Sequence, residues 1–191
     1  MKSSYEVRAA KFAAVLACLF AGCSTVDDFE FAVECYNDTH TRKLTTAHGV
    51  SRFVVIRSDY VIKFDMVPQG RWSDGSAGCI ASEERVYARA VADNMAHLLA
   101  KLTVGEAYGR KYAIMPRVRG VDDSWRWWAD HCTREEAYWL EDNVGDLHEG
   151  NVGYRNGKVC VIDYAWDEVE DRTGSAESSP YETSPFSGFQ Y

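Results

Sequence analysis

The chain has 191 residues, of which 21 are Lys or Arg and 29 are Asp or Glu, so its net charge is −8. This acidic balance argues against a general nucleic-acid-binding protein, which needs a basic surface to neutralise phosphates. Hydrophobic residues make up 46% of the chain, which is enough for a core and excludes a wholly disordered protein. Residues 1–121 carry 16 basic and 13 acidic side chains, whereas residues 122–191 carry 5 and 16. A partner of the second part is therefore expected to be cationic.

The N-terminal segment allows two interpretations. Lys2, Arg8 and Lys11 precede the apolar run FAAVLACLFAG, which is followed by Cys23. This arrangement resembles a bacterial lipoprotein signal in which Cys23 is lipidated. The alternative is an amphipathic helix, and no apolar run reaches the ~20 residues that a membrane-spanning helix needs. We expect the helix and a cytoplasmic protein, with an anchor through Cys23 as the alternative.

The region up to residue 66 predicts helices followed by a hairpin. Residues 5–36 favour one or two helices, interrupted between Gly22 and Asp28. Residues 37–50 are polar and indicate a loop. Two β-rich runs, RFVVIR (52–57) and YVIKFDM (60–66), are separated by only two residues. Such spacing is typical of a tight β-hairpin.

The central region predicts a helix and a further strand. Residues 67–80 contain Pro68 and three glycines and indicate a loop. A helix is expected to begin at Ser82 and to continue to about residue 102, because apolar residues recur at helical spacing. The run KYAIMPRV (111–118) favours a strand.

The last third predicts a capped helix and a second hairpin. Thr133 and Glu136 form a capping box for a helix that ends near residue 142. Two alternating runs then flank Asn156-Gly157, the strongest hairpin signal in the chain. We expect four regions: an N-terminal helical segment (1–45), a first lobe (46–120), a second lobe (121–171) and a disordered Ser- and Pro-rich tail (172–191).

The stretch DLHEGNVGYRNGKVCVID (146–163) carries the chemistry. It places Asp146 in a loop, Asn151 five residues later, and Asp163 at the end of the hairpin. Phosphoryl transfer from ATP needs a carboxylate to orient and deprotonate the acceptor hydroxyl, and oxygen ligands to hold Mg²⁺ against the phosphates. A tight hairpin would bring Asn151 and Asp163 to one edge of a sheet. Each of the three residues alone is also common in turns.

The D-x-H-x-G-N pattern resembles the catalytic loop of the protein-kinase-like fold, in particular its aminoglycoside phosphotransferase and small phage-encoded kinase branches. The resemblance implies Asp146 as catalytic base and Asn151 and Asp163 as magnesium ligands. It also implies an α+β fold, with an antiparallel N-lobe sheet, an αC-type helix, and a truncated, mainly helical C-lobe that carries the catalytic-loop hairpin. The usual D-F-G element reads Asp163-Tyr164-Ala165 in this chain.

A second group of residues resembles the nucleotide-binding residues of a kinase. Lys63 in YVIKF resembles the strand lysine that holds the phosphates, with Val61 on the same face of the strand, against the adenine. Glu84, or Glu83 one residue earlier, is expected to pair with Lys63 from the following helix. The strand 111–118 would lead into the hinge and place Met115 near the adenine.

Together these residues favour an ATP- and Mg²⁺-dependent phosphotransferase, expected to be a minimal phage-type Ser/Thr protein kinase that acts on host proteins or itself. Basic protein segments are the expected substrates, with no nucleic-acid partner. The alternatives are a small-molecule kinase of the aminoglycoside type and a pseudokinase that binds nucleotide without turnover. No G-x-G-x-x-G precedes residue 52, and only 28 residues follow Asp163. These two departures from a conventional kinase are what motivates the pseudokinase alternative.

Overall fold

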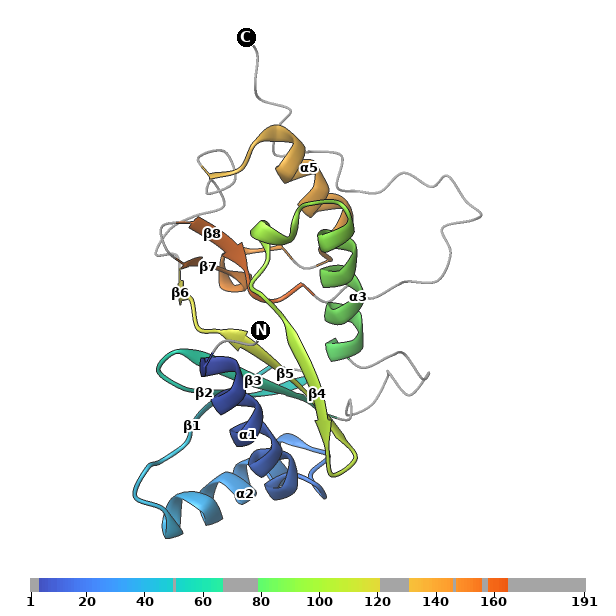
Figure 1. Cartoon of the computed structure of the whole chain (residues 1–191). Helices are drawn as coiled ribbons and strands as arrows, with labels where there is room; N and C mark the ends of the chain where they lie inside the picture. Colours follow the sequence, from blue (N-terminus) through green and yellow to red (C-terminus); the bar gives the residue numbers. More distant parts are fainter. Residues whose placement is uncertain are drawn as a thin grey trace.

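The computed structural model describes residues 4–49, 51–66, 79–120, 131–145, 147–155 and 158–164. The predicted tail, from residue 172 onward, lies outside these ranges. The described part is an α+β structure built around a five-stranded antiparallel sheet with strand order β1-β2-β3-β5-β4 (Figure 1). The strands are β1 (Thr45–His48), β2 (Arg52–Ile56), β3 (Tyr60–Asp65), β4 (Thr103–Ala107) and β5 (Arg110–Pro116).

The alternation of side chains along β3 separates the two faces of this sheet. Tyr60, Ile62 and Phe64 point into one hydrophobic cluster, whereas Val61 and Lys63 face the other way, as the sequence predicts. The predicted hairpin between β2 and β3 is present, and it pairs Val54 with Lys63. The sheet therefore presents Lys63 on the face opposite its main apolar core.

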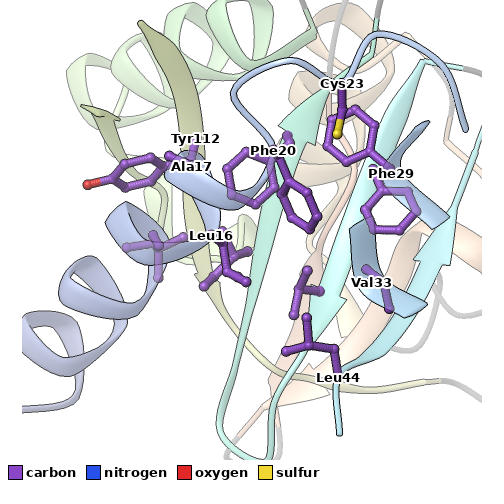
Figure 2. Close-up of a cluster of buried hydrophobic side chains, with 14 of the residues drawn as sticks. Leu16, Ala17, Phe20, Cys23, Phe29, Val33, Leu44 and Tyr112 are labelled. Carbon is purple, nitrogen blue, oxygen red and sulfur yellow. The ribbon is translucent and has the colours of Figure 1, made fainter. Parts of the chain in front are cut away.

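Two N-terminal helices cover the apolar face, α1 (Ser4–Leu19) and α2 (Val26–Thr39). Figure 2 shows Leu16, Phe20 and Phe29 in this cluster, with Phe20 between the other two. The ring of Phe20 packs against that of Phe29 of α2 and edge-on against Phe53 and Phe64. Thr25 and Asp28 form a capping box that begins α2, which agrees with the predicted interruption.

Cys23 lies between these two helices, and it is buried in the same cluster. Its thiol donates a hydrogen bond to the carbonyl oxygen of Asp28, 3.4 Å away. Cleavage of the chain before Cys23 would remove α1, and with it the fully buried Leu16 and Phe20. The predicted N-terminal helix is thus present, and lipidation of Cys23 stays an alternative prediction. None of the described helices has both the length and the hydropathy to cross a membrane.

The helix α3 (Cys79–Ala92) lies on the other face of the sheet and contacts β3 and β5 (Figure 1). It ends ten residues earlier than the prediction. Asn94 adopts a left-handed conformation with φ of 62°, and the amide of Met95 donates to the carbonyl of Ala90. This is a Schellman stop, in which a residue with positive φ ends the helix. The apolar residues that follow enter the short helix η1 (Ala96–Leu98) and β4 instead.

Two strands lie in regions where the sequence predicts none. β1 falls inside the predicted loop 37–50 and pairs with β2 as an edge strand. β4 is joined to β5 by Tyr108-Gly109, both with positive φ, as a two-residue type I′ turn requires.

The second part of the chain packs against α3 through a separate core. It contains α5 (Arg134–Asn143), η2 (Glu149–Asn151) and a small sheet of order β6-β7-β8, made of β6 (Arg119–Gly120), β7 (Val152–Arg155) and β8 (Lys158–Val161). The predicted capping box of Thr133 and Glu136 and the predicted hairpin are both present. Leu99 bridges to Val161, which joins the chain ahead of β4 to this small sheet. The described residues of the predicted second lobe thus contain the hairpin of β7 and β8 beside α5 and η2.

Candidate active site

A buried ion pair joins β3 to α3. The ammonium of Lys63 lies 2.6 Å from Oε1 of Glu83, and the side chains are 7% and 0% exposed. Burial of a lone charge costs several kcal/mol, so each group requires the other at this depth. The Glu83 oxygen also accepts a hydrogen bond from Arg52 at 2.7 Å, which gives it two cationic partners.

The partner of Lys63 is Glu83, and Glu84 is exposed to solvent. The orientation of α3 about its own axis explains why Glu83, and not Glu84, pairs with Lys63. The amide of Ile80 donates to the Asp65 carboxylate at the end of β3, 3.1 Å away, and this contact fixes the start of the helix. Ile80 is fully buried, and Glu83 lies one turn later on the same face. Burial raises the pKa of Asp65, and the hydrogen bond from Ile80 opposes that rise.

A cavity of about 430 Å³ lies beside this ion pair, between the sheet and the second part of the chain. Val61 and Met115, the two residues predicted to contact adenine, face each other in the register of β3 and β5 and both line it. Lys63 lines it as well. The remaining wall includes Ala47, His48, Gly49, Val54, Ile56, Pro116, Arg117, Val118, Gly150 and Ile162.

Asn151 and Asp163 lie on the opposite wall of this cavity. The amide of Ile162 donates to the carbonyl of Asn151 at 2.8 Å, so the hairpin brings the two predicted metal ligands to one end of the small sheet. Lys63 donates to the carbonyl of Ile162, 2.7 Å away, and thereby links the two walls. Asp146 lies outside the described residues, and its role stays a prediction.

Tyr164 fixes the chain directly after Asp163. Its side chain is fully buried, and its ring stacks on that of Tyr87 of α3, with centroids 6.4 Å apart. The hydroxyl donates to the carbonyl of Ala100 at 2.8 Å. Burial raises the pKa of this phenol. Tyr164 therefore ties the segment that carries Asp163 both to α3 and to the chain ahead of β4.

Replacing Tyr164 by Phe is expected to lower the free energy of unfolding by about 1–2 kcal/mol, because the ring still packs while the buried carbonyl of Ala100 loses its donor. Chemical denaturation followed by fluorescence measures this. Tyr138→Phe, at a side chain that is 40% exposed, is the matched control and should change the value by less than about 0.5 kcal/mol. Equal losses in the two variants would contradict the role of the Tyr164 hydroxyl.

Arg52 is the residue of this site that the sequence analysis missed. It begins β2, its side chain is 11% exposed, and its guanidinium contacts both Glu83 and the carboxylate of Asp163. The only sequence signal is its position: Arg52 alternates with Val54, which lies opposite Lys63 in the hairpin. Two cations and two carboxylates thus form one connected network of ion pairs.

Comparison with known proteins places few constraints on this site. No family model matches the chain, and no curated protein matches its sequence. Among solved structures, a co-crystal of WbdD with the kinase inhibitor LY294002 aligns with a TM-score of 0.34 and 18% identity, over 64% of this chain and 32% of that chain. A structure of the bifunctional kinase-methyltransferase WbdD aligns with a TM-score of 0.29 and 19% identity, over 60% and 29%. The chain thus spans about a third of these proteins, and such scores do not establish a common fold.

Proposed function

We propose that this protein is an ATP-dependent phosphotransferase. The observation that carries the proposal is the buried Lys63–Glu83 pair in the wall of a cavity whose other wall holds Asn151 and Asp163. Phosphoryl transfer is catalysed mainly by positioning and by electrostatic stabilisation of the phosphates. A fixed cation opposite two oxygen ligands supplies both.

Each residue then has a role that follows from its surroundings. Val61 and Met115 form an apolar wall that suits the flat face of adenine. Lys63 would bind the phosphates, and Glu83 would hold the Lys63 ammonium in place. Asp146 would accept the proton of the acceptor hydroxyl, a role that rests on the sequence pattern alone.

The residues of the cavity fit Mg²⁺. Carboxylate and amide oxygens are the hard ligands that Mg²⁺ prefers, and it usually takes only one or two carboxylates and completes its shell with phosphates and water. Among the described residues, no group of three or more His, Cys, Asp or Glu side chains could hold a metal ion. Asp163 and Asn151 would hold the ion, which would offset the charge of the phosphates.

We propose a protein substrate and, specifically, a minimal Ser/Thr protein kinase of the phage type that acts on host proteins or on itself. The acidic balance of residues 122–191 supports basic segments as the acceptors. A need for ATP supports the cytoplasm as its compartment.

A non-catalytic nucleotide-binding module is the second candidate. The ion pair between Arg52 and Asp163 favours it, because a guanidinium already neutralises the carboxylate proposed to hold Mg²⁺. In that case ATP would stabilise the protein without any phosphoryl transfer. Thermal unfolding with and without ATP and Mg²⁺ separates this candidate from an inactive chain that binds nothing.

The deciding experiment incubates the full chain with γ-labelled ATP, Mg²⁺ and a host-cell extract or a basic peptide. We expect label on the protein or the acceptor, and its loss in Asp146→Asn and Asp163→Asn, because these changes remove the base and a metal ligand. Asp142→Asn, at an exposed position near the end of α5, is the control and should transfer label as the unmodified protein does. Transfer that persists in both site variants would overturn the proposal.

A further inference from the structure

Arg52 connects two elements that are far apart in the sequence. Its Nη1 donates to Glu83 of α3 at 2.7 Å, and its Nη2 contacts Oδ1 of Asp163, which follows β8. Arg52 is not among the residues that line the cavity, whereas Asp163 is. Asp163 therefore lines the cavity while its carboxylate contacts a guanidinium that does not line it.

The chemistry of the guanidinium suits this position. Its planar fork can donate to two carboxylates at once in a fixed geometry, whereas an ammonium is a point charge. Arg52 is nearly buried and Glu83 is wholly buried, so the side chains have little freedom. Lys63 makes a parallel connection from Glu83 to Ile162, the residue before Asp163. Lys63 and Arg52 thus both bind Glu83 of α3, and they connect it to the adjacent residues Ile162 and Asp163.

The Arg52 contact has two opposing consequences for Asp163. It fixes one carboxylate oxygen, and the side chain stays 33% exposed at the cavity, so the carboxylate is oriented before any ligand arrives. It also places a permanent positive charge beside the carboxylate, and this charge repels a second cation. Pre-orientation favours fast transfer, whereas the repulsion weakens metal binding.

We propose that Arg52 is a positioning residue that orients Asp163 and α3 for catalysis and, by its charge, weakens the binding of Mg²⁺ at Asp163. The part of this proposal that concerns the metal rests on the proposed function. The connection between α3 and Asp163 does not depend on it. By binding both Glu83 and Asp163, Arg52 would keep the ion pairs between α3 and the segment after β8 in place without a separate activation step such as phosphorylation.

The metal part is tested with Mn²⁺ alone, which shares the oxygen ligands of Mg²⁺ and is followed by water proton relaxation. Arg52→Gln is expected to lower the dissociation constant of Mn²⁺ about tenfold, because a charge a few ångströms away is removed. Arg52→Lys keeps the charge and should bind nearly as the unmodified protein does. Arg89→Gln, on the exposed side of α3, is the charge-matched control and should not change binding. An unchanged or higher dissociation constant in Arg52→Gln would overturn the metal part.

The connection is tested by a thermodynamic cycle that needs neither metal nor nucleotide. Chemical denaturation of the unmodified protein, Arg52→Gln, Asp163→Asn and the double variant gives the coupling between the two side chains. We expect a double variant whose unfolding equilibrium constant differs about fivefold or more from the product of the single effects. Arg52→Met, which also removes the charge, takes the place of Arg52→Gln if the latter does not fold. Additive effects would overturn the connection itself.

The two tests separate this inference from the proposed function. If Mn²⁺ binds to none of the proteins while the cycle shows coupling, the metal site and the metal part are wrong and the connection stands. If Mn²⁺ binds and Asp163→Asn abolishes binding, the metal site stands. The response of Arg52→Gln then supports or overturns the metal part of the inference.

Discussion

Replacing Lys63 by Met is expected to lower kcat/KM for phosphoryl transfer from ATP by roughly 100- to 1,000-fold, the range found when one preorganised charge-stabilising donor is removed. Lys63 is the cation proposed to bind the phosphates, and it lies at the cavity wall with its ammonium held by Glu83 and by the carbonyl of Ile162. Met fills a similar volume but can neither donate to a phosphate nor connect the two walls. Steady-state kinetics with a basic peptide measures the effect.

The control for this variant is Lys111→Met. Lys111 belongs to the same sheet, but it is exposed on β5 and does not line the cavity. It should leave kcat/KM within about twofold, since exposed substitutions away from a site have small effects. Equal rates in Lys63→Met and the unmodified protein would contradict the role of Lys63 in transfer.

The sequence predicted the local features of this site because they depend on short-range patterns. The period-2 alternation of YVIKF is sufficient to place Lys63 and Val61 on one face of β3. The flanking runs of Asn156-Gly157 predict the second hairpin, and that hairpin brings Asn151 and Asp163 together. Both predictions required only neighbouring residues.

The choice between Glu83 and Glu84 required the phase of α3. Apolar residues recur at helical spacing along this segment and include Val91, but Val91 is 57% exposed and therefore does not mark the buried face of α3. The buried stripe passes through Ile80 and Ala90, and Glu83 lies on it. The contact between Ile80, at the start of α3, and Asp65, at the end of β3, sets that phase. The sequence between β3 and α3 has no hydrophobic periodicity from which this contact could be predicted.

The end of α3 and the contacts of Arg52 could not be predicted from the sequence, for two different reasons. Apolar residues continue at helical spacing beyond Asn94, so the hydrophobic pattern predicts a longer helix. The chain nevertheless leaves the helix at a Schellman motif, in which Asn94 has positive φ. Arg52 and Asp163 are 111 positions apart, and no local rule relates them. They meet because both segments contact α3, through Glu83 on one side and Tyr87 on the other.

Replacing Glu83 by Gln is expected to lower the free energy of unfolding by about 3 kcal/mol or more, because removing one member of a buried ion pair leaves an uncompensated charge. Here two cations, Lys63 and Arg52, lose the same anion, while the shape of the side chain is preserved. Phosphoryl transfer should fall as well, since Lys63 loses the group that orients it. Glu84→Gln is the matched control: it removes the same charge one residue later, at an exposed position, and should change the free energy of unfolding by less than about 0.5 kcal/mol. Chemical denaturation of the two variants side by side measures the difference, and equal losses would mean that the Lys63–Glu83 pair does not hold α3 in place.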